Sequence, residues 1–163
     1  MGALAASGRG VLALPDYPAM YRDADLVAVI RFVDLKDTNK TKELTDLTSR
    51  PSGLQFRELN GRIKLVSLLK GTVDSPIVCR LYRFPTFEEC SNDLGDQDVA
   101  RKRLSACIRD FGLVHVFWLK PAGDIQNVDF LVYLKKAPDG LYIPVTGDSD
   151  SHSAIRELVQ ARR

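Results

Sequence analysis

Residues 26–34 read LVAVIRFVD, and no other stretch says more about the fold. Its positions form two alternating sets, because successive side chains of a β-strand point to opposite faces. One set is Leu26, Ala28, Ile30 and Phe32, and the other is Val27, Val29, Arg31 and Val33. Both sets are largely apolar, which predicts a central strand covered on both faces.

Apolar stretches further along the chain predict additional strands at residues 54–69, 77–84, 113–119, 128–135 and 141–145. Within the first of these, Asn60-Gly61 predicts a hairpin turn, because both residues tolerate a positive φ. Asp139-Gly140 predicts a second hairpin turn, which leads into the last strand.

A helical period replaces the alternation between residues 97 and 111. The apolar positions there lie on one helical face: Ala100, Leu104, Cys107, Ile108 and Phe111. Asp96 or Asp98 can cap the start of this helix, and Gly112 stands where a glycine often ends one. We therefore expect one central amphipathic helix.

Three segments flank or interrupt this core. Residues 16–22 can form a short helical turn capped by Asp16, and residues 153–160 a closing helix capped by Asp150 or Ser151. Residues 36–52 are polar, charged and end beside Pro51. This composition predicts a long loop or a disordered insertion, and does not say whether it binds anything.

A chain of 163 residues falls in the usual range for one domain. Short strands with hairpin turns and one inserted helix predict a mainly β fold, a small barrel or sandwich, with a C-terminal helix. We expect residues 16–163 to form this domain and residues 1–15 a flexible N-terminal segment. That segment is either a disordered tail or the remnant of a signal peptide.

The composition limits the class of function. With 45% hydrophobic and 27% charged residues, the chain is ordinary for a globular protein. Its net charge of +2 is nearly balanced, which makes nucleic acid an unlikely partner. No apolar run is long enough for a membrane-spanning helix.

The three cysteines are Cys79, Cys90 and Cys107, and their spacing fits neither a zinc site nor a CxxC redox pair. Cys79 and Cys107 are typical of small core residues. A bridge between Cys79 and Cys90 is the alternative in an exported protein.

The two histidines suggest no catalytic or metal site. His115 lies in a predicted strand with no second ligand or base nearby in the sequence, which favours a structural role. His152 follows Asp148 and Asp150 in GDSDSHS, where helix capping explains the cluster more simply than a metal does. The motifs GxSxG, GxGxxG and the Walker loop are absent, so we expect no cofactor.

Two groups of residues could contact nucleic acid but have structural explanations. Arg101-Lys102-Arg103 lies opposite the apolar stripe of the central helix and reads as a solvated face. Tyr82-Arg83-Phe84 and Phe117-Trp118 set aromatic rings near positive charge, where bases can stack. Aromatic residues in strands more often fill cores or pair across strands.

Three segments together resemble the netrin-like domains and tissue inhibitors of metalloproteinases, including bacterial exported relatives of unknown function. They are Ala24-Asp25-Leu26-Val27, IKLVSLLKG at residues 63–71, and FLVYL at residues 130–134 followed by Asp139-Gly140-Leu141-Tyr142. The resemblance implies a five-stranded OB-like barrel with helices at its ends, and an exported protein, periplasmic or extracellular. Those inhibitors chelate zinc through an N-terminal Cys-x-Cys, and this chain has no cysteine before Cys79, so that mechanism does not carry over.

The leading hypothesis is a non-enzymatic binding or interaction module with a protein or another ligand as its partner. It predicts a contiguous apolar patch with a polar rim on the surface. The alternatives are an enzyme whose acid and base groups come from distant parts of the sequence, and a structural, envelope-associated domain. The first alternative predicts two carboxylates, or a carboxylate and His115, in one pocket.

Overall fold

The computed structural model describes residues 15–45, 51–73, 76–110, 125–148 and 151–158. Its strands are β1 (Leu26–Thr45), β2 (Pro51–Lys70), β3 (Ile77–Arg83), β4 (Asp129–Lys136), β5 (Tyr142–Pro144) and β6 (Ile155–Leu158). Its helices are α1 (Tyr17–Asp23), α2 (Phe87–Leu94), α3 (Gln97–Asp110) and α4 (Ser151–Ala154), with one 3₁₀ turn, η1 (Ile125–Asn127). The prediction of a mainly β fold is confirmed. In this part of the chain, no helix is long and apolar enough to cross a membrane.

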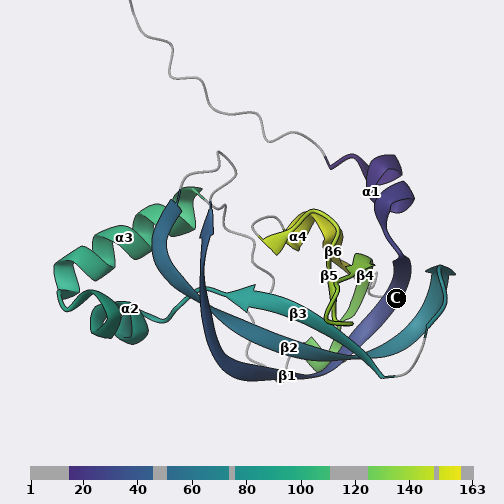
Figure 1. Ribbon diagram of the computed structural model, residues 1–163, viewed down its shortest axis with the longest axis horizontal. Coiled ribbons are helices and arrows are strands. Elements are labelled where there is room, and N and C mark those ends of the chain that lie inside the picture. Colours follow the sequence, from purple (N-terminus) through teal and green to yellow (C-terminus); the bar gives the residue numbers. More distant parts are fainter. Residues whose placement is uncertain (1–14, 46–50, 74–75, 111–124, 149–150, 159–163) are drawn as a thin grey trace, which may run out of the picture.

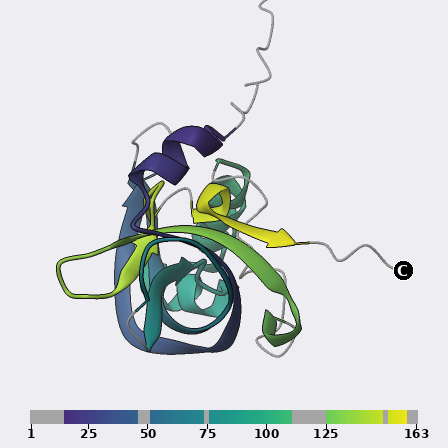
Figure 2. The same ribbon diagram turned by 90° about the vertical axis from the view of Figure 1, so that its right-hand side faces the viewer.

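The sheet curls on itself into a ring, seen end-on in Figure 2. Its strand order is β1-β2-β3-β5-β4-β6, and β1 also pairs with β4. All pairings are antiparallel except the single parallel bridge between β3 and β5, at Cys79 and Tyr142. In Figure 1, α2 and α3 lie at one end of the strands and α1 lies at the other.

The two longest strands, β1 and β2, correct two predictions. Residues 36–45 belong to β1, so the predicted loop at 36–52 is wrong over these residues, and 51–52 begin β2. Asn60-Gly61 is not a turn either, because it lies within β2, where Gly61 pairs with both Leu35 and Cys79. A Cβ on Gly61 would come within 2.9 Å of the Phe32 ring. The glycine therefore serves close packing inside the sheet.

The first strand is central, as its sequence predicts, since it pairs with β2 on one side and β4 on the other. Leu26, Ala28, Ile30 and Phe32 are all buried. The opposite face is covered at Val27 but open at Val33, which is 42% exposed. Coverage on both faces thus holds for the first part of this strand and fails toward its middle.

Most predicted helices are present. The central helix α3 agrees with the prediction, and the Asp96 carboxylate accepts hydrogen bonds from the backbone N–H of Asp98 and Val99 at its start. Asp16 caps α1 as expected. Gly112 and the predicted strand at residues 113–119 lie outside the described residues.

The predicted closing helix at residues 153–160 is wrong over residues 155–158, which form a strand. The helix α4 ends at Ala154, and β6 pairs with β4 from Ile155 to Leu158. Ile155 is buried while the three residues after it are exposed. Pairing with β4 therefore overrides the local helical pattern. Of the two residues proposed to cap the closing helix, Asp150 lies outside the described residues.

The core consists of three separate clusters. The first fills the ring and includes Phe32, Leu81, Phe130 and Leu134. The second joins the far end of the β1–β2 hairpin to α2 and α3, and consists of Leu44, Leu54, Phe56, Tyr82, Phe84, Cys90 and Ala100. The third packs α1 and α4 on the outside of the ring, around Met20, Val27 and Tyr133.

Candidate functional site

The histidines and acids that the sequence singled out do not assemble into a described site. His115 and Asp150 lie outside the described residues, as does the side chain of His152. Asp148 is ion-paired with Lys42, with 2.7 Å between the carboxylate Oδ2 and Nζ. Across the described residues, no group of three or more His, Cys, Asp or Glu side chains could hold a metal ion.

The cysteines with described side chains are core residues. Cys79 lies in the first cluster and Cys90 in the second, and both are free thiols. The bridge considered between them is therefore wrong. Burial raises the pKa of both thiols, which keeps them protonated and poorly nucleophilic. The side chain of Cys107 lies outside the described residues.

The aromatic residues considered for base stacking are inaccessible where they are described. Tyr82 and Phe84 are buried in the second cluster, and Phe56 packs against Phe84 with tilted rings whose centroids are 5.0 Å apart. Phe117-Trp118 lies outside the described residues. Arg101-Lys102-Arg103 is exposed, as predicted, and the Arg101 guanidinium lies over the Phe87 ring.

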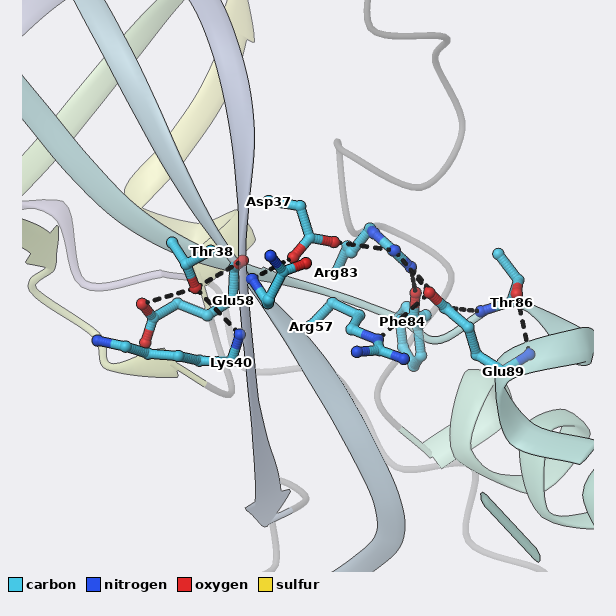
Figure 3. Close-up of polar contacts among 10 residues, drawn as sticks. Asp37, Thr38, Lys40, Arg57, Glu58, Arg83, Phe84, Thr86 and Glu89 are labelled. Carbon is cyan, nitrogen blue, oxygen red and sulfur yellow. Dashed lines mark hydrogen bonds and ion pairs between the residues drawn. The ribbon is translucent and has the colours of Figure 1, made fainter. Parts of the chain in front are cut away.

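A charged cluster joins the strands to the start of α2 (Figure 3). Arg83 donates two hydrogen bonds to the Glu89 carboxylate, at 2.8 and 2.9 Å, and a third to Asp37. Arg57 lies 3.2 Å from the same Glu89 carboxylate. Glu89 also accepts a hydrogen bond from the backbone N–H of Thr86 as part of a capping box. These contacts lower the pKa of Glu89 to about 2, chiefly through the bonds from Arg83.

Glu58 extends this cluster toward the strand interior. Its carboxylate accepts hydrogen bonds from the hydroxyls of Thr38, at 3.1 Å, and Tyr82, at 3.4 Å. Burial is the main cause that raises the pKa of Tyr82 to about 12, and Glu58 adds to it. Both acids thus hold neighbouring side chains in place, and the cluster fixes α2 on β2 and β3.

A shallow hollow of about 470 Å³ is lined by Asp25, Gly71, Thr72, Lys136 and Tyr142. The Asp25 carboxylate accepts a hydrogen bond from the backbone N–H of Lys136 at 2.8 Å. Gly71 has a φ of +92° and touches the Asp25 carbonyl so closely that no Cβ would fit. Among its described lining residues there is one carboxylate and no histidine, so the pair of carboxylates that the enzyme hypothesis predicts is not found there.

The last part of β2, residues 64–70, is the most unusual surface of the molecule, and we call it the β2 edge. β3 pairs with β2 as far as Ile63 and Ile77, whereas β1 continues to Lys70. Beyond Ile63, none of the described strands covers the other side of β2. In Figure 1 this end of β2 reaches past the beginning of β3, on the side of the molecule where α1 lies.

The β2 edge is apolar, and among the described residues no strand pairs with its outer side, although the Tyr21 hydroxyl donates to the carbonyl of Leu69. Leu65, Val66, Leu68 and Leu69 are between 36% and 51% exposed. Leu65 pairs with Ile30, and Leu68 pairs with Ala28. Directly paired residues share a face of the sheet, so Leu65 and Leu68 lie on the face that forms the core. The interior face of the ring therefore continues into solvent at this end.

Two bulges lie within the β2 edge, and a lysine stands at each of its ends. The register with β1 shifts at Val29/Ile30 and again at Val27/Ala28, so β2 carries extra residues there. Lys64 is exposed at one end. At the other end, Lys70 donates to the carbonyls of Tyr21, Arg22 and Ala24, at 2.7, 2.9 and 2.6 Å. Bulges and flanking lysines are features that limit uncontrolled pairing of a free strand.

Sequence reasoning assigned residues 64–69 to a strand but missed this surface. The run LVSLL breaks the alternation of apolar and polar residues that a half-buried strand shows. That break is the signal that could have revealed it. The sequence matches no family model, and no curated protein matches it either. The site itself must therefore support any function assigned to the chain.

Proposed function

We propose that this chain is a non-enzymatic interaction module on an OB-like barrel, and that its β2 edge binds an extended segment of a protein. The ring order supports the barrel, because β1 links β2 to β4, and β3 meets β5 in parallel. The pair α2 and α3 stands between β3 and β4 in the chain. The likeness to netrin-like domains and the exported location stay predictions.

The observation that carries the proposal is the apolar β2 edge, whose outer side pairs with none of the described strands. Strands with free backbone groups bind extended peptides by adding a strand, and neighbouring side chains supply the specificity. Four partly exposed apolar residues, Leu65, Val66, Leu68 and Leu69, lie together there. Burying the exposed part of these side chains would yield roughly 1 kcal/mol each before the cost of association. This sum of about 4 kcal/mol only offsets the lower end of the cost of association, so the hydrogen bonds of an added strand must supply the rest of the affinity.

The polar surroundings fit the same proposal. Lys64 and Ser67 are exposed at the β2 edge, and Lys70 closes it beside α1. An apolar patch with a polar rim is the usual form of a protein-binding surface. The two other features of the surface support binding less well than the β2 edge does. The charged groups around Glu89 already pair with one another, and the hollow at Asp25 has a single carboxylate.

The test compares two variants of the full chain that add the same charge to the same strand. Val66→Lys introduces a charge within the β2 edge, and Gln55→Lys introduces one on the exposed face far from it. Each variant and the wild type would be immobilised and used to capture proteins from the native host's lysate and culture fluid. Free copies of the chain would be added to these samples.

We expect Val66→Lys to reduce capture at least tenfold while Gln55→Lys leaves it unchanged. Circular dichroism and thermal unfolding would check that both variants fold. Equal capture by all three proteins, or capture of nothing specific by the wild type, would contradict the proposal.

A further inference from the structure

We infer that the hollow at one end of the ring binds a small zwitterion, a molecule such as a free α-amino acid that carries both an ammonium and a carboxylate. Its lining residues are Asp25, Gly71, Thr72, Lys136 and Tyr142. They stand where β1 and β5 begin and where β2 and β4 end. This would be a second site, distinct from the β2 edge and beyond the proposed function.

The Asp25 carboxylate is held in a fixed position that suits a cationic group. The backbone N–H of Asp25 donates to the carbonyl of Leu134 at 2.9 Å, and the backbone N–H of Lys136 donates to Oδ2 of Asp25 at 2.8 Å. These bonds fasten both the backbone and the side chain of Asp25 to β4. Among the described residues, no side chain donates to this carboxylate, so its second oxygen keeps its capacity to accept a bond from the ammonium of a ligand.

The Lys136 ammonium supplies the opposite charge. Lys136 is exposed, and within the described part of the chain its ammonium pairs with no carboxylate. Because the backbone N–H of the same residue is bonded to Asp25, the flexible stem of the lysine starts beside that carboxylate. The ammonium can therefore reach the carboxylate of a molecule whose own ammonium rests on Asp25.

Tyr142 adds a hydrogen-bond donor that the fold leaves unused. The residue is only 7% exposed and belongs to the cluster that fills the ring, yet it also lines the hollow. No described residue is a hydrogen-bond partner of its hydroxyl, and the hydroxyl is not among the described polar atoms that lack both a partner and access to solvent. The hydroxyl is therefore open to the hollow, where it can donate to a carboxylate that lies beside Lys136.

The charges of the lining select the class of ligand. A simple anion would be repelled by the Asp25 carboxylate and a simple cation by the Lys136 ammonium, whereas a molecule with both charges satisfies both groups. Four of the five lining residues have polar side chains, which disfavours an apolar ligand. The volume of about 470 Å³ is in the range of sites for small molecules. Gly71 allows the end of β2 to approach Asp25, because a Cβ there would clash with the Asp25 carbonyl oxygen.

The test titrates the full chain with L-alanine and follows the backbone amide signals by NMR. Acetate and methylammonium, which each carry one of the two charges, serve as matched probes. Asp25→Asn removes the negative charge and keeps an oxygen that can accept from the backbone of Lys136, and Lys136→Met removes the positive charge. Lys135→Met is the control, because Lys135 precedes Lys136 on β4 and points to the opposite face.

We expect saturable shifts at the amides of Gly71, Thr72 and Lys136, with a dissociation constant of roughly 1–10 mM, because solvent screens the charges of an open site. Acetate and methylammonium should bind about fivefold more weakly or worse, because each makes only one of the two charged contacts. L-alanine should bind Asp25→Asn and Lys136→Met more weakly by the same factor, whereas Lys135→Met should bind it as the wild type does.

Three results would overturn the inference. The first is no saturation of the wild type by about 100 mM L-alanine. The second is equal binding of the probes that carry a single charge, and the third is undiminished binding of L-alanine by both Asp25→Asn and Lys136→Met. None of these results bears on capture at the β2 edge, which Val66→Lys tests separately.

Discussion

Glu89 shows how one side chain can connect several parts of this molecule. Its carboxylate accepts two hydrogen bonds from Arg83 and one from the backbone of Thr86, and it lies beside Arg57. Strands β2 and β3 and the first turn of α2 are thereby held together. Charge-assisted, two-pronged bonds of this kind are the strongest of the ordinary hydrogen bonds.

We predict that Glu89 makes the stability of the fold depend on pH. Its pKa falls from 4.5 to about 2 on folding, so its contribution is fully present above pH 4.5 and is lost as the pH falls toward 2. After allowance for screening by solvent, Glu89→Gln should cost about 1–2 kcal/mol near neutral pH and much less in acid. Urea unfolding of the wild type and of Glu89→Gln, near neutral pH and in acid, measures this difference in the free energy of unfolding.

The neighbouring exposed carboxylate supplies the control for this prediction. Glu88 lies in the same turn of α2. Glu88→Gln should change the free energy of unfolding by less than about 0.5 kcal/mol at either pH. If Glu89→Gln lowers the free energy of unfolding by as much in acid as at neutral pH, then the shape of the side chain, and not its charge, stabilises the fold.

Local sequence signals at this scale are of unequal value. Thr86-Phe87-Glu88-Glu89 carries the pattern of a capping box, a signal from which α2 could have been predicted. Asn60-Gly61 carries an equally strong turn signal, yet the fold uses Gly61 to admit the Phe32 ring. No local rule separates these cases, because the ring comes from another strand.

At the scale of elements, α1 depends on a lysine that lies in a strand far along the sequence. Lys70 donates to three carbonyls in and just after α1, while the hydroxyl of Tyr21 donates back to the carbonyl of Leu69. A cation at the C-terminal end of a helix satisfies free carbonyls and complements the helix dipole. A helix this short would be marginal without such support.

We predict that Lys70→Met loosens α1 and leaves the ring intact. The substitution keeps the length of the side chain and removes the charge, which should cost about 1–3 kcal/mol locally. The backbone amides of Met20 and Ala24, bonded within α1, should then exchange with solvent at least tenfold faster. Hydrogen exchange measures this, with Lys36→Met on β1 as an exposed control. Unchanged exchange at both amides would refute the role of Lys70.

Elements with a strong local pattern were predictable and those set by distant partners were not. The first part of β1, β3, β4 and α3 agree with alternation or helical period, and the Asp139-Gly140 turn is present with Gly140 at a φ of +84°. The polar residues 36–45 become a strand because residues 51–60 pair with them. Ile155 begins a strand because β4 offers an edge. Cross-strand partners of this kind leave no trace in a short window of sequence.

At the scale of the whole molecule, the sequence patterns allow a barrel or a sandwich, and they do not reveal the pairings that decide ring closure. Ring closure depends on the pairing of β1 with β4 and on one parallel bridge between Cys79 and Tyr142. The candidate site is a consequence of that closure, because β3 leaves β2 at Ile63 and exposes residues 64–70. The sequence predicted an apolar patch as a requirement of the binding hypothesis, but its location emerges from the unequal lengths of the strands.

The separation of the core into clusters predicts that the molecule opens in parts. The cluster at α2 and α3 shares no residue with the cluster inside the ring, and the two are joined through β1, β2 and β3. Units with their own apolar contacts often open independently of the rest. Phe56, buried against Phe84, is the natural place to weaken the outer unit.

We predict that Phe56→Leu, at a cost of about 1–2 kcal/mol, raises local opening of α2 and α3 selectively. The amides of Cys90, Gly95 and Ala100, bonded at the starts and ends of these helices, should exchange about tenfold faster. The amides of β4 should keep their protection, because β4 packs in the ring cluster. Ile30→Val, which weakens the ring by a similar mechanism, should lower protection in both units, since the outer unit is anchored on strands of the ring. An equal loss of amide protection throughout the chain in Phe56→Leu would mean that the clusters unfold as one unit. The β1–β2 hairpin would then transmit strain along its whole length.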